Sequence, residues 1–193
     1  MSFLSLSTSS RIIGNQMRTQ LAEITARHDE SCSAMSNIKQ MPPQNLSAKK
    51  HWFEDTIAKT LGENLLFMHW VGRALKSVAI MPCITEDSEA TRRAVITSYS
   101  TNVRSNSTTS IPIIILTQHA MQRLMERKKD VRLLTLIKEE FDAAFLLEVL
   151  KSTEPVVCNP IIEPVNLKID TVHGTAIVQI GLDGVIMKTW YTK

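Results

Sequence analysis

The fold class of the C-terminal part depends on one stretch, Gly174-Thr-Ala-Ile-Val-Gln-Ile-Gly-Leu-Asp-Gly-Val-Ile-Met-Lys-Thr-Trp-Tyr191. Residues 175–180 and 185–191 are rich in the β-branched and aromatic residues that are typical of strands. Asp183-Gly184 between them is a strong signal for a tight turn. We therefore predict an antiparallel hairpin. Apolar and polar residues also alternate over 165–170, which predicts another strand directly before the hairpin.

Two helices are predicted upstream of these strands. Residues 131–151 carry apolar side chains at the 3.6-residue period of an amphipathic helix. Before them, Thr117 can cap a helix over residues 117–127, which follows a β-branched run at 113–116. The order in residues 113–193 is therefore helix, helix and then an antiparallel β-meander.

The first part of the chain is predicted to be helical. A helix is expected from Ser47 to about Val78, although Gly62 and Gly72 weaken it, and another is expected over 85–96. Residues 97–112 are mostly serine, threonine and asparagine, which favour loops. We expect an α+β protein with an N-terminal helical bundle in residues 1–96, a linker at 97–112 and an α+β part at 113–193.

Composition narrows the class of protein. The chain has 193 residues, a net charge of +3 and 44% hydrophobic residues, which is typical of a globular protein. Its three cysteines, Cys32, Cys83 and Cys158, are too far apart for a local metal site, and no apolar run is long enough to span a bilayer. The start of the sequence does not have the pattern of a secretion signal. We expect a cytoplasmic location and no cofactor, metal or membrane partner.

The helix at 117–127 carries the chemistry that points to a function. It reads Thr117-Gln-His-Ala-Met-Gln-Arg-Leu-Met-Glu-Arg127, so His119, Arg123 and Arg127 form one row along one helical face. A proton carrier beside fixed positive charge suits phosphate chemistry. The same spacing also occurs on the solvated face of an ordinary amphipathic helix.

Together with the closing hairpin, this helix resembles small toxin-type domains. These belong to the grouping of metal-independent ribonucleases that includes barnase, EndoU, colicin and RelE-type toxins, in which helices precede an antiparallel sheet. The resemblance covers residues 113–193 and rests on the helix and on the hairpin motif with Asp183-Gly184, Thr189 and Tyr191. It implies an intracellular toxin or effector that cleaves RNA.

RNA cleavage without a metal requires a base, an acid and cations for the charge on phosphorus. His119, near the positive end of its helix dipole, is the candidate base, with Arg123 as a cation. His173 is the candidate acid. Thr189 and Tyr191, two residues apart on one strand face, are candidates to hold a phosphate.

Two other functions remain open. A non-catalytic protein, such as a mobile-element inhibitor or an adaptor, would use the same surfaces to bind a protein partner. A nucleic-acid-binding regulator would use the basic cluster at the helix junction, which consists of Arg127, Lys128, Lys129 and Arg132. The enzyme hypothesis requires that His119, Arg123 and the face with Thr189 and Tyr191 come together. The oligomeric state is not predicted.

Overall fold

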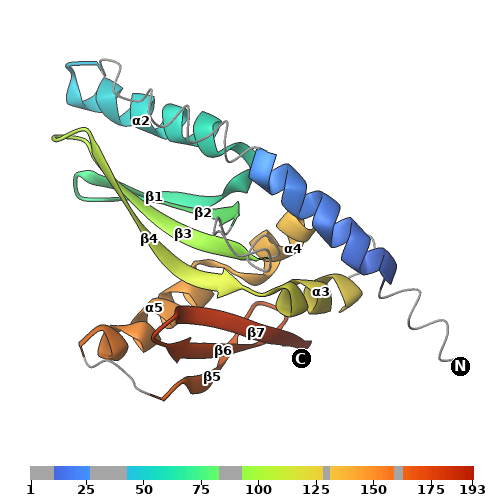
Figure 1. Cartoon of the computed structure of the whole chain (residues 1–193). Coiled ribbons are helices and arrows are strands. Elements are labelled where there is room, and N and C mark those ends of the chain that lie inside the picture. The colour runs from blue at the N-terminus through green and yellow to red at the C-terminus, as the bar shows by residue number, and fades with distance from the viewer. Residues whose placement is uncertain (1–10, 27–42, 83–92, 128–130, 159–162) are drawn as a thin grey trace, which may run out of the picture.

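The computed structural model describes residues 11–26, 43–82, 93–127, 131–158 and 163–193 (Figure 1). These parts form a mixed fold in which seven strands make one sheet, in the order β1-β2-β3-β4-β7-β6-β5. The α+β class predicted from the sequence is confirmed. The structure differs from the prediction in where the strands begin.

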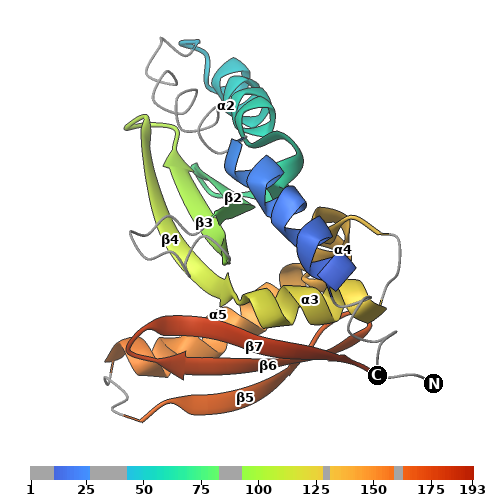
Figure 2. The same cartoon turned by 45° about the vertical axis from the view of Figure 1, so that its right-hand side comes forward.

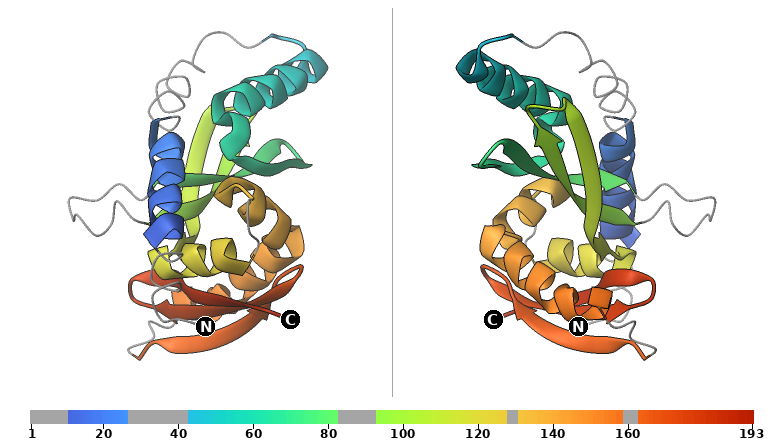
Figure 3. Two further views of the ribbon diagram at one scale, coloured as in Figure 1. Left: turned by 90° about the vertical axis from the view of Figure 1, so that its right-hand side faces the viewer. Right: turned by 90° about the vertical axis from the view of Figure 1, so that its left-hand side faces the viewer.

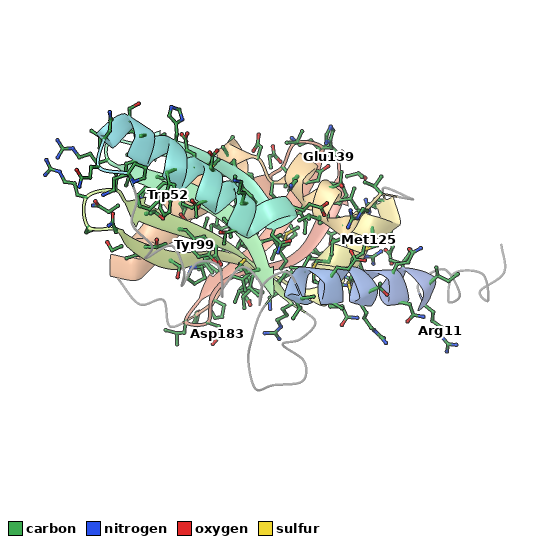
Figure 4. All side chains as sticks on the ribbon, turned by 90° about the horizontal axis from the view of Figure 1, so that it is seen from above. Arg11, Trp52, Tyr99, Met125, Glu139 and Asp183 are labelled. Carbon is green, nitrogen blue, oxygen red and sulfur yellow. The ribbon has the colours of Figure 1, made fainter. Side chains whose placement is uncertain are left out.

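Four strands build the first half of the sheet as an antiparallel meander. They are β1 Leu65–Val71, β2 Ala74–Pro82, β3 Ala94–Asn102 and β4 Ser107–Leu116. Helix α2, Leu46–Leu61, buries Phe53 and Ile57 against Leu75 and Ala79 of β2. Figure 4 looks down on α2, with Trp52 labelled on the helix.

An N-terminal helical bundle is not confirmed, because strands occupy residues that we expected to be helical. The helix predicted to reach Val78 ends at Leu61, and Gly62 follows it with φ +51°, a conformation that favours glycine. After the short 3₁₀ helix η1, Gly62–Asn64, the chain enters β1. Gly72, with φ +60°, lies in the turn between β1 and β2. Both glycines are thus turn residues and not weak points in one helix.

The two other predictions for this region are corrected in the same way. Of the helix expected at 85–96, residues 85–92 lie outside the described residues, and Ala94 begins β3. The linker expected at 97–112 belongs to the β3–β4 hairpin. Thr101 and Thr108 face each other there, with their hydroxyl oxygens 3.0 Å apart. Asn102 accepts a hydrogen bond from the backbone N–H of Arg104 in the turn, at 2.9 Å. The polar residues therefore stabilise a hairpin, because threonine also favours strands.

The second half follows the predicted order of helices and then strands. Its elements are α3 Gln118–Arg127, α4 Leu133–Glu140, α5 Ala143–Cys158, β5 Val165–Asp170, β6 Gly174–Gly181 and β7 Gly184–Thr192. The antiparallel meander β5-β6-β7 is confirmed, and Gly184 has φ +94° in the turn between β6 and β7. The single helix predicted at 131–151 is two helices. They separate at Phe141, which has non-helical dihedral angles, and Asp142 then caps α5.

The two halves of the sheet meet at a short parallel junction. Ile115 pairs with Ile186 and Leu116 with Met187, and β4 ends there. The chain continues as α3, which runs along β7 (Figure 2). One hydrophobic core includes buried residues of both halves, such as Ile96 of β3 and Val178 of β6. The junction thus positions α3 beside β7.

The helix over residues 11–26 joins the same core through Met17, Leu21 and Ile24 (Figure 3). Its Gln20 side chain accepts a hydrogen bond from the backbone N–H of Leu133, at the start of α4. Such a bond satisfies an N–H group that a helix leaves without an internal partner. The helix over 11–26 therefore supports α4 directly and α3 through the shared core.

Candidate functional site

The start of α3 is fixed to β7 by Thr117. Its hydroxyl donates a hydrogen bond to the backbone oxygen of Met187 at 2.9 Å and accepts one from the backbone N–H of Ala120 at 3.2 Å. The predicted cap is therefore confirmed. The same side chain aligns the helix with the strand, which determines where the residues of the row lie.

The row of His119, Arg123 and Arg127 lies on the side of α3 that faces away from the core. Met121 and Leu124 are buried, whereas His119 and Arg127 are exposed and Arg123 is half-buried. We use the name α3–β7 surface for the side of α3 that carries this row, together with the neighbouring exposed residues of β7. The buried face and the row thus follow from one helical period.

Arg127 is held in place by the end of β7. Its guanidinium carbon lies 5.7 Å from the centre of the Tyr191 ring, and its NH1 atom donates to the Thr192 hydroxyl at 2.8 Å. Tyr191 is 47% exposed, so its ring remains accessible. We refer to Arg127, Tyr191 and Thr192 as the Arg127 cluster. A fixed cation beside an aromatic face and a hydroxyl can contact both a phosphate and a base.

The other residues predicted on this surface are placed less favourably for contact with a phosphate. Arg123 forms an ion pair with Glu126, with 2.9 Å between nitrogen and oxygen, so part of its charge is neutralised. Thr189 is only 9% exposed. His119 makes no hydrogen bond to another residue in the described parts of the chain. Among the predicted residues that the structure describes, Arg127 and Tyr191 are in contact with each other.

A buried carboxylate lies near the end of the sheet where β7 reaches Thr192. Glu140, the last residue of α4, is fully buried. Its Oε2 atom accepts hydrogen bonds from the Thr171 hydroxyl at 2.9 Å and from the backbone N–H of His173 at 3.0 Å, and its Oε1 atom lies 3.0 Å from His173 Nδ1. Thr171 in turn accepts a hydrogen bond from Trp190 Nε1 at 2.9 Å. We call these four residues the His173 network.

Glu140 is the residue of this site that sequence reasoning missed, since it reads as an ordinary acid at the end of a helix. Its position contained a signal. Leu133, Leu136 and Glu140 follow each other at spacings of three and four, so the carboxylate lies on the apolar stripe of α4. A charged residue on such a stripe needs buried partners.

The two candidate histidines lie far apart along β7. His119 is in the first turn of α3, and Thr117, directly before this helix, binds the backbone oxygen of Met187 near the middle of β7. The carbonyl of His173 accepts from the backbone N–H of Lys193, and the next residue, Gly174, pairs with Thr192. The five residue-to-residue steps from Met187 to Thr192 span about 16 Å. The structure therefore brings His173 close to the Arg127 cluster and separates it from His119.

The predicted basic cluster is also divided. Arg132 forms ion pairs with Glu23 at 3.1 Å and Glu63 at 3.6 Å, which connect α4 to the first part of the chain. Lys128 and Lys129 lie outside the described residues. Arg127 and Arg132 thus contact different parts of the molecule.

Within the parts of the chain that the structure describes, no group of three or more histidine, cysteine, aspartate or glutamate residues is arranged to hold a metal ion. In the same parts, no helix has the length and apolar character needed to cross a lipid bilayer. Comparisons with protein-family models, curated proteins and solved structures found no match.

Proposed function

We propose that this protein is a metal-independent, endoribonuclease-like toxin or effector that acts in the cytoplasm and binds single-stranded RNA on the α3–β7 surface. The observation that carries the proposal is the Arg127 cluster. Arg127 is held by Tyr191 and Thr192 at one end of an exposed row that also contains Arg123 and His119.

The chemistry of the surface fits a phosphodiester better than a neutral ligand. A guanidinium group binds a phosphate through paired donors, and its contact with the Tyr191 ring limits its freedom before RNA arrives. An exposed aromatic ring offers a stacking face for a base of any sequence. The resemblance of the α3 helix and the closing hairpin to toxin-type ribonucleases supports the same function.

The test is cleavage of labelled single-stranded RNA by the purified protein in the presence of a metal chelator. Arg127→Ala is expected to weaken RNA binding roughly tenfold, the effect of losing one charge-assisted hydrogen bond. The matched control is Arg104→Ala, because Arg104 is exposed in the β3–β4 turn, outside α3 and β7. In cells, wild-type protein should arrest growth. Intact RNA and normal growth with the wild-type protein would reject the proposal.

A second candidate, binding of a protein partner such as an inhibitor or a target, is favoured by a separate observation. An apolar groove of about 360 Å³ is lined by β4, α5 and the β6–β7 turn. Ile111 in its wall is 63% exposed, and neighbouring Leu182 is 78% exposed. Exposed apolar patches of this kind mark protein contacts. If Ile111→Asp abolished the capture of a stoichiometric partner while Arg127→Ala did not, this function would be preferred.

A further inference from the structure

The hydrogen bonds of the Glu140 carboxylate determine how the His173 ring is oriented. Oε2 receives two donors, the Thr171 hydroxyl and the backbone N–H of His173. Donated hydrogen bonds of this kind favour an ionised carboxylate. With Glu140 ionised, Oε1 has no proton to give, and the Nδ1 atom 3.0 Å away carries the hydrogen. The lone pair of the neutral imidazole is then on Nε2.

We infer that Glu140 is a positioning residue that holds His173 as its Nδ1–H tautomer, so that Nε2 serves as the general base for RNA cleavage beside the Arg127 cluster. This inference rests on the proposed function. It changes the predicted role of His173 from acid to base. It also moves the proton transfer from the start of α3, where His119 lies, to the Thr192 end of β7.

The position of His173 fits this role. Its side chain is 58% exposed although its partner carboxylate is fully buried, so one side of the ring is fixed and a substrate can reach the ring. Gly174, the next residue, pairs with Thr192, whose hydroxyl binds Arg127. A phosphate on Arg127 would therefore lie at the same end of the sheet as the imidazole.

The reaction step is a transesterification. Nε2 takes the proton of the ribose 2′-hydroxyl, and the 2′-oxygen forms a bond to phosphorus while the bond from phosphorus to the 5′-oxygen breaks. The departing 5′-oxygen takes a proton from water, and the imidazolium returns its proton to the solvent. The products are a 2′,3′-cyclic phosphate and a free 5′-hydroxyl, and no oxidant or co-reactant is needed. The Arg127 guanidinium stabilises the charge that develops on the phosphoryl oxygens.

The first test is nitrogen-15 NMR of the histidine rings in mildly alkaline solution, where imidazole is neutral. His173 is expected as the Nδ1–H tautomer, in contrast to exposed His119, which is expected as the Nε2–H form that predominates in water. Glu140→Gln should invert the His173 tautomer. The amide oxygen must replace Oε2 to accept from Thr171 and the backbone N–H, so the amide NH₂ group then donates to Nδ1. An Nε2–H tautomer of His173 in the wild-type protein would overturn the inference.

The second test is the rate of RNA cleavage. His173→Ala and Glu140→Gln are each expected to lower the rate by about 10²–10⁴-fold, the loss typical of removing a base or inverting its tautomer. His51→Ala is the matched control, because His51 is an exposed histidine on α2. If Glu140→Gln fails to fold, judged by circular dichroism, the wild-type spectrum and His173→Ala still decide.

The outcomes separate the two proposals. RNA cleavage by the wild-type protein that persists in His173→Ala would overturn the base assignment and leave the proposed function intact. A wild-type protein that does not cleave RNA would overturn the proposed function and the base role with it. In that case the NMR spectrum would still test whether Glu140 sets the His173 tautomer.

Discussion

Gly174, which follows His173, is closely packed against β7. A Cβ atom built there would lie 2.2 Å from the Tyr191 carbonyl oxygen and 2.4 Å from the Trp190 ring. Gly174→Ala is therefore expected to lower the free energy of unfolding by about 1–3 kcal/mol, because the backbone of β7 must shift. Chemical denaturation measures this loss.

Gly181→Ala is the control for that measurement, since the atoms nearest to a Cβ there belong to Pro164 and lie at 3.5 Å, an ordinary contact distance, and glycine and alanine should differ little. Equal stabilities of the two variants would contradict the packing argument. A shift of β7 would also disturb the hydrogen bond from Trp190 to Thr171. Gly174→Ala should therefore alter the NMR signals of the His173 ring, which the control should not do.

Asp170 gives a prediction about pH. Hydrogen bonding to Lys193, followed by hydrogen bonding to Thr175, lowers the pKa of the Asp170 carboxyl below its ordinary value. Because the Asp170 pKa is lower in the folded state, the ionised carboxylate stabilises the fold. This stabilisation is present above the unfolded pKa and is lost as pH falls through the folded pKa. Lys193→Ala should raise the Asp170 pKa, measured by carbon-13 NMR of the carboxyl. Thr175→Val should raise the Asp170 pKa less. An unchanged Asp170 pKa in both variants would contradict these two hydrogen bonds as the cause of the shift.

The boundary between helices α4 and α5 depends on Asp142. Its carboxylate accepts a hydrogen bond from the backbone N–H of Phe145 at 2.9 Å, in the first turn of α5. Asp142→Ala should lower the free energy of unfolding by about 1 kcal/mol, the usual effect of removing an N-cap. Asp142→Asn keeps an accepting oxygen and should retain most of the stability. If both variants unfold like the wild-type protein in urea, the cap is not significant.

This boundary illustrates what the sequence can and cannot predict. Phe141 and Phe145 are both buried, so a helical period continues across the break and conceals it. Local signals sufficed where one residue type dictates the geometry, as with Gly184 in the hairpin and Thr117 at the start of α3. They failed in the first half, where Gly62 and Gly72 are read as tolerated helix residues unless the turn that each makes is known. Strand pairing there is a property of partners far apart in the sequence.

The candidate site also combines local and long-range features. The row on α3 follows from periodicity, and its contact with Tyr191 required only that α3 run beside β7. The link between Glu140, at the end of α4, and His173, in the turn between β5 and β6, joins residues 33 positions apart. No local pattern pairs them, because the pairing depends on how α4 packs against the start of β6. The sequence therefore predicted the exposed residues of the α3–β7 surface better than it predicted Glu140, the buried partner of His173.

The two halves of the sheet share one core, although β4 and β7 are joined by only two residue pairs. Met187 is fully buried at this junction, opposite Leu116. Met187→Ala should cost about 2–5 kcal/mol through the cavity that it leaves. Because the core is continuous, we expect amide hydrogen exchange to accelerate in β3 as well as in β6. Leu182→Ala, at a side chain that is 78% exposed, should leave both strands protected. Faster exchange in β6 with unchanged protection in β3 would instead mean that residues 113–193 fold as a separate domain. The measurement therefore decides whether the α3–β7 surface forms without the first half of the sheet.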